Sequence, residues 1–201
     1  MSTPLDLAPR WPLSGDEAVR DELLAAYADP GRGYHDTRHL AEVLDRLDEL
    51  AGAGASFDRV AVGLAAWFHD AVYDGRPGAE ERSAIWAETA LAGHDPELVA
   101  EVARLVRLTE THRPAADDPN GCALSDADLA ILAATPIRYA EYLVDVRREY
   151  AHVPDEDFRA GRAAVLSDLL GKPGLFHTAH AREHWEPVAR ANVEAELSRL
   201  A

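Results

Sequence analysis

The feature that most constrains the fold is an apolar stretch from Val60 to Tyr73, which carries His69 and Asp70 side by side near its end. A helix that is hydrophobic all round lies buried. A buried carboxylate is costly unless it is paired or binds a metal. Neighbours on a helix point about 100° apart, so only a cation lying between those two directions takes a ligand from each. The alternative is a core histidine bonded to a backbone carbonyl, beside an aspartate paired with an arginine.

The length and composition of the chain limit what it can be. A chain of 201 residues is long enough for one sizeable core, so a single domain over 1–201 is predicted. The formal charge of −16 argues against non-specific binding to nucleic acid. No apolar run approaches the roughly 20 residues of a membrane span, and Met1 to Asp6 does not begin a signal peptide.

Cys122 is the single cysteine, so no internal disulfide is possible. Together with the composition, this indicates a cytoplasmic protein that binds neither nucleic-acid polymers nor membranes. The sequence leaves a homodimer open.

Helical patterns follow one another along the chain, without a convincing alternating strand. From Leu40 to Leu50, for example, apolar residues recur at helical spacing and form one stripe. The predicted helices cover approximately residues 14–28, 36–50, 56–73, 79–91, 95–111, 126–133, 135–150, 154–170 and 180–200. The sequence therefore predicts an all-α bundle of eight or nine helices.

Three further places carry side chains suited to chemistry. His35 and His39 are four residues apart at a helix start, so they share a face, although two surface histidines would also fit there. Asp126 and Asp128 precede an apolar run, where one could cap the helix and the other be a solvated acid favoured by the helix dipole. His112 lies where another helix ends, a position that favours cationic residues in any case.

Several short motifs occur in a recognisable order. They are Tyr-His-x-x-x-His at 34–39, Trp-Phe-His-Asp-Ala-Val-Tyr-Asp at 67–74, Glu-x-Ser-Ala at 81–84, Thr-x-x-His at 109–112, Ser-Asp-Ala-Asp-Leu at 125–129 and Gly-Arg-x-x-Val-Leu at 161–166. This order resembles the HD superfamily of metal-dependent phosphohydrolases. More narrowly, it resembles an uncharacterised bacterial branch described as predicted metal-dependent HD phosphohydrolases. The resemblance covers about residues 30–178 and implies an HD-domain helical bundle.

The resemblance implies a set of metal ligands, which are His39, His69, Asp70 and Asp128. Asp128 is preferred to Asp126 because the last aspartate of the family follows alanine and precedes a bulky residue. His39 is preferred to His35 because the first histidine of the family is followed by the apolar stripe of its helix. Two imidazoles and two carboxylates suit one ion of Mn, Fe, Co, Ni or Zn better than Ca. A six-coordinate ion would keep two positions for water and a substrate oxygen.

The same resemblance suggests roles for the surrounding residues. The candidates for proton transfer are Glu81, Asp74 and His112, and those for binding the substrate phosphate are His35, Arg38, Arg113 and Lys172, with His112 also able to donate. The implied function is hydrolysis of a phosphate ester or anhydride of a small molecule, for which a nucleotide is a candidate. The alternatives are a dinuclear-iron HD oxygenase, which would recruit His35 and His112, and a non-catalytic HD module that binds a nucleotide.

Overall fold

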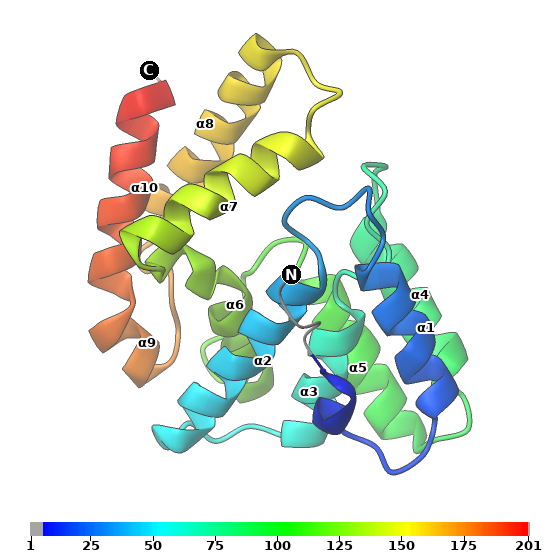
Figure 1. Cartoon of the computed structure of the whole chain (residues 1–201). Helices are drawn as coiled ribbons and strands as arrows, with labels where there is room; N and C mark the ends of the chain where they lie inside the picture. The colour runs from blue at the N-terminus through cyan, green and yellow to red at the C-terminus, as the bar shows by residue number, and fades with distance from the viewer. Residues whose placement is uncertain (1–5, 201) are drawn as a thin grey trace.

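The computed structural model describes residues 6–200, and every regular element in this range is a helix (Figure 1). The α-helices are α1 (Glu17–Tyr27), α2 (Thr37–Gly52), α3 (Arg59–Phe68), α4 (Ala79–Ala90), α5 (Pro96–Leu108), α6 (Pro119–Leu129), α7 (Pro136–Glu149), α8 (Asp155–Gly171), α9 (Ala179–His184) and α10 (Glu186–Leu200). Two 3-10 helices, η1 (Ala8–Arg10) and η2 (Ala130–Ala133), complete the set. The predicted all-α class is confirmed, with ten α-helices in the described range where eight or nine were expected.

The additional helix arises because the last predicted helix is divided. Trp185 separates α9 from α10, and Pro187 lies in the first turn of α10. Proline has no N–H and its ring clashes with the carbonyl four residues earlier, so it suits the first turn of a helix and not its interior. The interruption therefore falls just before Pro187.

Helix α6 begins earlier than the sequence indicates. Asp118 caps it by accepting a hydrogen bond from Gly121 N at 2.9 Å, and Pro119 occupies the first turn. The Asp-Pro-Asn-Gly segment, which has the composition of a loop, thus starts a helix. Asp126 and Asp128 consequently lie in the last turn of α6 and not at its start, so neither one caps its N-terminus.

Helix α3 is the centre of the fold, as its apolar sequence predicts. All residues from Ala61 to Phe68 are buried, and α3 packs against α2, α5 and α6. Asp58 caps its start by accepting from the backbone N–H groups of Val60 and Ala61. The helix ends at Phe68 with His69 as its C-cap, so the chain leaves the helix just before Asp70.

The remaining helices lie on two sides of this centre (Figure 1). Helices α4 and α5 pack together on one side, with α1 beside them in the view. On the other side α10 packs against η2, α8 and α9. Helices α2, α3 and α6 contact one another between these groups, and their side chains form the candidate site. Among residues 6–200, no helix has the length and hydrophobicity needed to cross a bilayer.

Candidate metal centre

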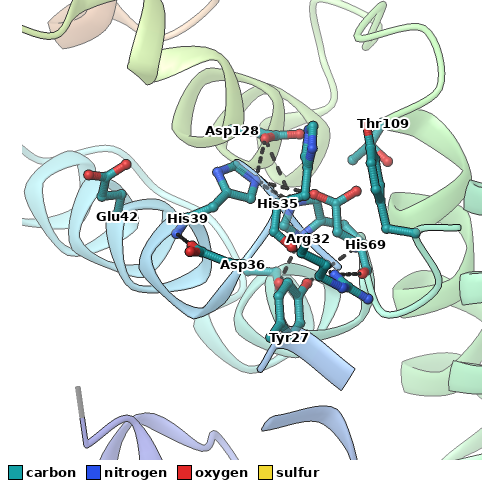
Figure 2. Close-up of polar contacts among 12 residues, drawn as sticks. Tyr27, Arg32, His35, Asp36, His39, Glu42, His69, Thr109 and Asp128 are labelled. Atoms are coloured by element: carbon teal, nitrogen blue, oxygen red, sulfur yellow. Dashed lines mark hydrogen bonds and ion pairs between the residues drawn. The ribbon is translucent and has the colours of Figure 1, made fainter. Parts of the chain in front are cut away.

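Four side chains from α2, α6 and the end of α3 converge at the centre of the bundle, and we call them the His–Asp cluster: His39, His69, Asp70 and Asp128. His39 Nε2 lies 3.0 Å from His69 Nε2 and 3.2 Å from Asp128 Oδ1. Asp70 Oδ2 lies 3.3 Å from His39 Nε2 and 3.0 Å from His69 Nε2. Figure 2 shows His39, His69 and Asp128 around this point. The structure thus brings all four predicted ligands together.

Backbone structure sets the direction of both imidazoles. Asp36 caps α2 by accepting from Arg38 N and His39 N, which places His39 in the first turn of the helix. His69 Nδ1 lies 2.8 Å from the carbonyl oxygen of Ala66. Because a carbonyl can only accept, Nδ1 is the donor, and in a neutral ring Nε2 then carries the free lone pair. That lone pair is directed at the cluster, the arrangement typical of a metal-binding histidine.

A buried arginine fixes the segment after α3. Arg32 Nη1 donates to the backbone oxygen of Asp70 at 2.7 Å, and Nη2 donates to that of Ala71 at 2.9 Å. Tyr27 Oη accepts from Asp70 N at 3.2 Å (Figure 2). Arg32 is therefore close to Asp70 but binds its main chain and leaves its carboxylate to the histidines. The alternative raised by the sequence holds for the carbonyl contact of His69 and fails for the arginine partner of Asp70.

The two aspartates of α6 have different surroundings. Asp128 Oδ1 faces His39 and His69, at 3.2 Å and 3.7 Å. Asp126 instead accepts backbone hydrogen bonds from His177 N at 2.8 Å and Thr178 N at 2.7 Å. Burial raises the pKa of Asp126 to about 6, although these two bonds oppose the shift. The structure therefore places Asp128, and not Asp126, in the His–Asp cluster.

The charges of the cluster depend on one another. Burial alone would lower the pKa of His39, but hydrogen bonds with Asp128 and Asp70 raise it to about 10. Burial disfavours the ionised carboxylate of Asp70, but the charge of His69 holds its pKa well below the usual range. The metal-free cluster therefore favours protonated imidazoles on His39 and His69, which compensate its two carboxylates. A metal ion would supply that positive charge in place of the protons.

The spacing of the ligand atoms fits a metal ion. Transition metals bind nitrogen and carboxylate oxygen at roughly 2.0–2.2 Å, so two ligands at right angles lie about 3 Å apart. The separations of 3.0 to 3.3 Å among His39, His69 and Asp70 match this spacing. Candidate ligand atoms of these three residues all lie within 4.8 Å of one another. The group could hold a metal ion, with Asp128 beside it.

His112 approaches the cluster from the end of α5. Its Nε2 lies 3.6 Å from Asp128 Oδ2, and its Nδ1 is buried without a hydrogen-bond partner among residues 6–200. Its backbone φ is 48°, in the left-handed region that is unfavourable for a residue with a side chain. Lys172 Nζ donates to the carbonyl oxygens of Thr111 and His112, at 3.3 Å and 3.5 Å. Lys172 therefore contacts the backbone beside His112 and not the cluster itself. Backbone strain like that of His112 is often found at functional sites.

His35 also lies beside the cluster, where Glu149, a residue that no sequence motif indicates, holds it. Its Nδ1 is 2.6 Å from Glu149 Oε2, and its ring stacks on Tyr73 with centroids 3.9 Å apart. The ring centroids of His35 and His39 are 5.4 Å apart. Glu149 also accepts a hydrogen bond from Gly33 N. A side chain at position 33 would collide with the backbone of α7. A glycine at 33 thus allows α7 to approach closely.

The structure does not bring the other predicted residues to the cluster. Glu81 pairs with Arg107, Asp74 with Arg82, Arg113 with Asp168, and Arg38 with Glu42 and Glu141. Hydrogen bonds from their arginine partners lower the pKa of Glu81 and of Asp74. Both carboxylates are therefore ionised at neutral pH and hold no proton to donate.

Comparison with known proteins adds no further assignment. No protein-family model matches the chain, and neither a curated protein nor a solved structure matches it. The functional argument consequently rests on the geometry of the cluster and on the motif order in the sequence.

Proposed function

We propose that the chain is a metal-dependent phosphohydrolase of the HD type, acting on a phosphate ester or anhydride of a small molecule. The observation that supports this most is the convergence of His39, His69, Asp70 and Asp128, with imidazole nitrogens and carboxylate oxygens 3.0 to 3.7 Å apart. Their order along the chain is the H…HD…D order of that superfamily. The donor set is mixed nitrogen and oxygen, which suits a divalent transition metal.

Such an ion supplies a water nucleophile at neutral pH and offsets charge on a phosphoryl group. The chain's own residues hold and orient the reactants. Arg32 and Tyr27 fix the backbone that carries Asp70. His35, oriented by Glu149, is positioned to donate a hydrogen bond to a phosphoryl oxygen.

His112 is the predicted proton-transfer residue that lies nearest the cluster. Burial lowers its pKa, so its imidazole is neutral at neutral pH. A neutral imidazole can accept a proton from an attacking water, and general-base catalysis of this kind typically contributes 10²–10⁴-fold. We therefore assign His112 the role of base, in preference to Glu81 and Asp74, whose carboxylates are ionised but are paired with Arg107 and Arg82 away from the cluster.

The test compares Asp70→Asn with the wild type, with and without chelator. Asn keeps the size of the side chain and removes its charge, so the variant should lose its metal and its metal-dependent hydrolysis of a phosphatase panel. Chelator should lower the melting temperature of the wild type towards that of the variant and barely move the variant. The control is Asp168→Asn, which removes an exposed aspartate and should behave as wild type.

A wild type that holds no transition metal and shows no rise in melting temperature with Mn²⁺ would refute the proposal. So would severe destabilisation of Asp70→Asn in a protein that is insensitive to chelator. In that case Asp70 would be a purely structural ion-pair residue.

A further inference from the structure

A cavity of about 300 Å³ adjoins the His–Asp cluster, and His39 and Asp128 form part of its wall. The rest of the lining comes from α2, α6, η2 with the residue after it, and α7, and from Tyr34, just before α2. This volume is at the lower end of small-molecule sites. A molecule with one end at the cluster would extend its other end into this space.

Two residues that line the cavity carry hydrogen-bond donors without a partner among the described residues. Tyr34 is 5% exposed, and its hydroxyl has no hydrogen-bond partner within the described part of the chain. Arg138 Nη1 is likewise buried without one, while its Nε and Nη2 donate to Glu42 at 2.6 Å and 2.9 Å. The guanidinium lies 5.8 Å from the centroid of the Tyr34 ring, so the donors are neighbours. Buried polar groups in native proteins are nearly always paired, and an exception calls for a ligand or water.

The charges of the cavity restrict what those donors can bind. Both lining arginines are already neutralised, Arg138 by Glu42 and Arg46 by Glu49. Asp45 and Asp128 also line the cavity, so carboxylates outnumber guanidiniums there. At this short range these carboxylates would repel a second phosphate group of the bound molecule. A neutral group with hydroxyls can instead accept from Tyr34 and Arg138 and donate to the carboxylates.

We propose that this cavity holds the alcohol part of a phosphate monoester, a neutral hydroxylated group such as a sugar, and that the Tyr34 hydroxyl donates a hydrogen bond to one of its oxygens. This inference rests on the proposed function, because it places the phosphate end at the His–Asp cluster. Tyr34 also lies where the cavity meets the His–Asp cluster, since its ring packs on His39 with centroids 4.7 Å apart. Nucleoside di- and triphosphates, whose leaving groups are anionic, are poor candidates for the same space.

The experiment measures binding of two non-hydrolysable probes to the Mn²⁺-loaded protein by isothermal titration calorimetry. Methylphosphonate reaches only the cluster, whereas the phosphonate analogue of ribose 5-phosphate also fills the cavity. Tyr34→Phe should weaken binding of the sugar phosphonate by about threefold to tenfold, the worth of one hydrogen bond. It should leave methylphosphonate binding and the metal content unchanged.

A stability measurement distinguishes this role from a structural one. In chelated protein, Tyr34→Phe should keep or raise the melting temperature, because it removes a buried hydroxyl that has no partner. The matched control is Tyr139→Phe, which loses a hydrogen bond to Glu196 and should lower the melting temperature. A Tyr34→Phe variant that is destabilised as much as Tyr139→Phe, or that binds the sugar phosphonate as wild type does, would overturn the inference. If methylphosphonate failed to bind the wild type, the proposed function would itself be refuted.

Discussion

Two buried polar clusters of the molecule are built in opposite ways. In the first, Arg162 of α8 pairs with Glu196 of α10 through bonds of 2.7 Å and 3.1 Å, and Tyr139 of α7 donates to the same carboxylate. In the His–Asp cluster, two carboxylates converge on two imidazoles whose Nε2 atoms are 3.0 Å apart. Both clusters are shielded from solvent, with Glu196 5% and His39 1% exposed.

The difference lies in how the charges and hydrogen bonds match. In the Arg162–Glu196 cluster, one cation meets one anion and both carboxylate oxygens have donors, so the cluster is complete. In the His–Asp cluster, acceptors face one another, and the two carboxylates are compensated only when protons or a divalent metal ion are added. Buried charge by itself therefore does not identify a functional site. The feature that indicates a cation site is an excess of hydrogen-bond acceptors that converge on one point.

The largest effect on folding should come from breaking the complete cluster. Glu196→Gln removes the negative charge and leaves Arg162 buried without a counter-ion, which typically costs about 3–5 kcal/mol. Urea denaturation should show this loss, while metal content stays at the wild-type level. A Glu196→Gln variant that lost its metal as well would show that the two clusters are coupled and end the contrast between them.

The second prediction uses the two aspartates of α6. Asp126→Ala leaves the N–H groups of His177 and Thr178 without their acceptor, at a cost of about 1–3 kcal/mol for each buried group. Its metal affinity should remain close to that of the wild type. Asp128→Ala should abolish metal binding and destabilise the chelated protein less. Metal analysis and chemical denaturation of both variants measure this, and the reverse pattern would make Asp126 the ligand.

The sequence predicts the residues of the His–Asp cluster but not those of the Arg162–Glu196 cluster. The candidate ligands lie in short local motifs whose order resembles that of the HD superfamily, so all four could be chosen before the fold was known. The preference for Asp128 over Asp126 came from motif context. No feature of the sequence distinguishes Glu196, which lies on the last helix among many other acidic residues.

The parts that could not be predicted depend on contacts between distant segments. Arg32 reaches the backbone of Asp70 from 38 positions away, and Glu149 reaches His35 from 114 positions away. Neither contact leaves a local pattern. Glu81 and Asp74 belong to the short motifs and are predicted to lie near the metal, but ion pairs with Arg107 and Arg82 hold them at the surface. Sequence proximity to a ligand is thus a weak guide to a place in the site.

The third prediction concerns pH. The pKa of His39 is about 10 in the metal-free fold, against about 6.5 in an unfolded chain. Its contribution to stability is therefore complete below about pH 6.5 and is lost as the pH rises towards 10. Metal must displace this proton, so metal affinity should rise by up to about tenfold per pH unit over the same range. The melting temperatures of chelated and Mn²⁺-loaded protein should consequently diverge between pH 6.5 and 9, and a constant gap would contradict the shift.

The smallest effects are expected for the two carboxylates outside both clusters. Glu81 is held by Arg107 Nε and Nη2, at 2.6 Å and 2.8 Å, and its side chain is 53% exposed. Asp74 is held in the same way by Arg82. Exposed pairs of this kind contribute little to stability. Because neither carboxylate reaches the His–Asp cluster, Glu81→Gln and Asp74→Asn should leave metal content and turnover unchanged.

His112→Gln provides the contrast for these two variants, since His112 does face Asp128. Its turnover should fall by about 10²–10⁴-fold while its metal content is retained. If Glu81→Gln lost turnover with its metal intact and His112→Gln did not, the proton-transfer role would belong to Glu81. The start of α4, which carries Glu81, would then have to move during the reaction to bring that carboxylate inward. Measuring kcat of the three variants in parallel therefore decides whether the cluster as it stands contains its own base.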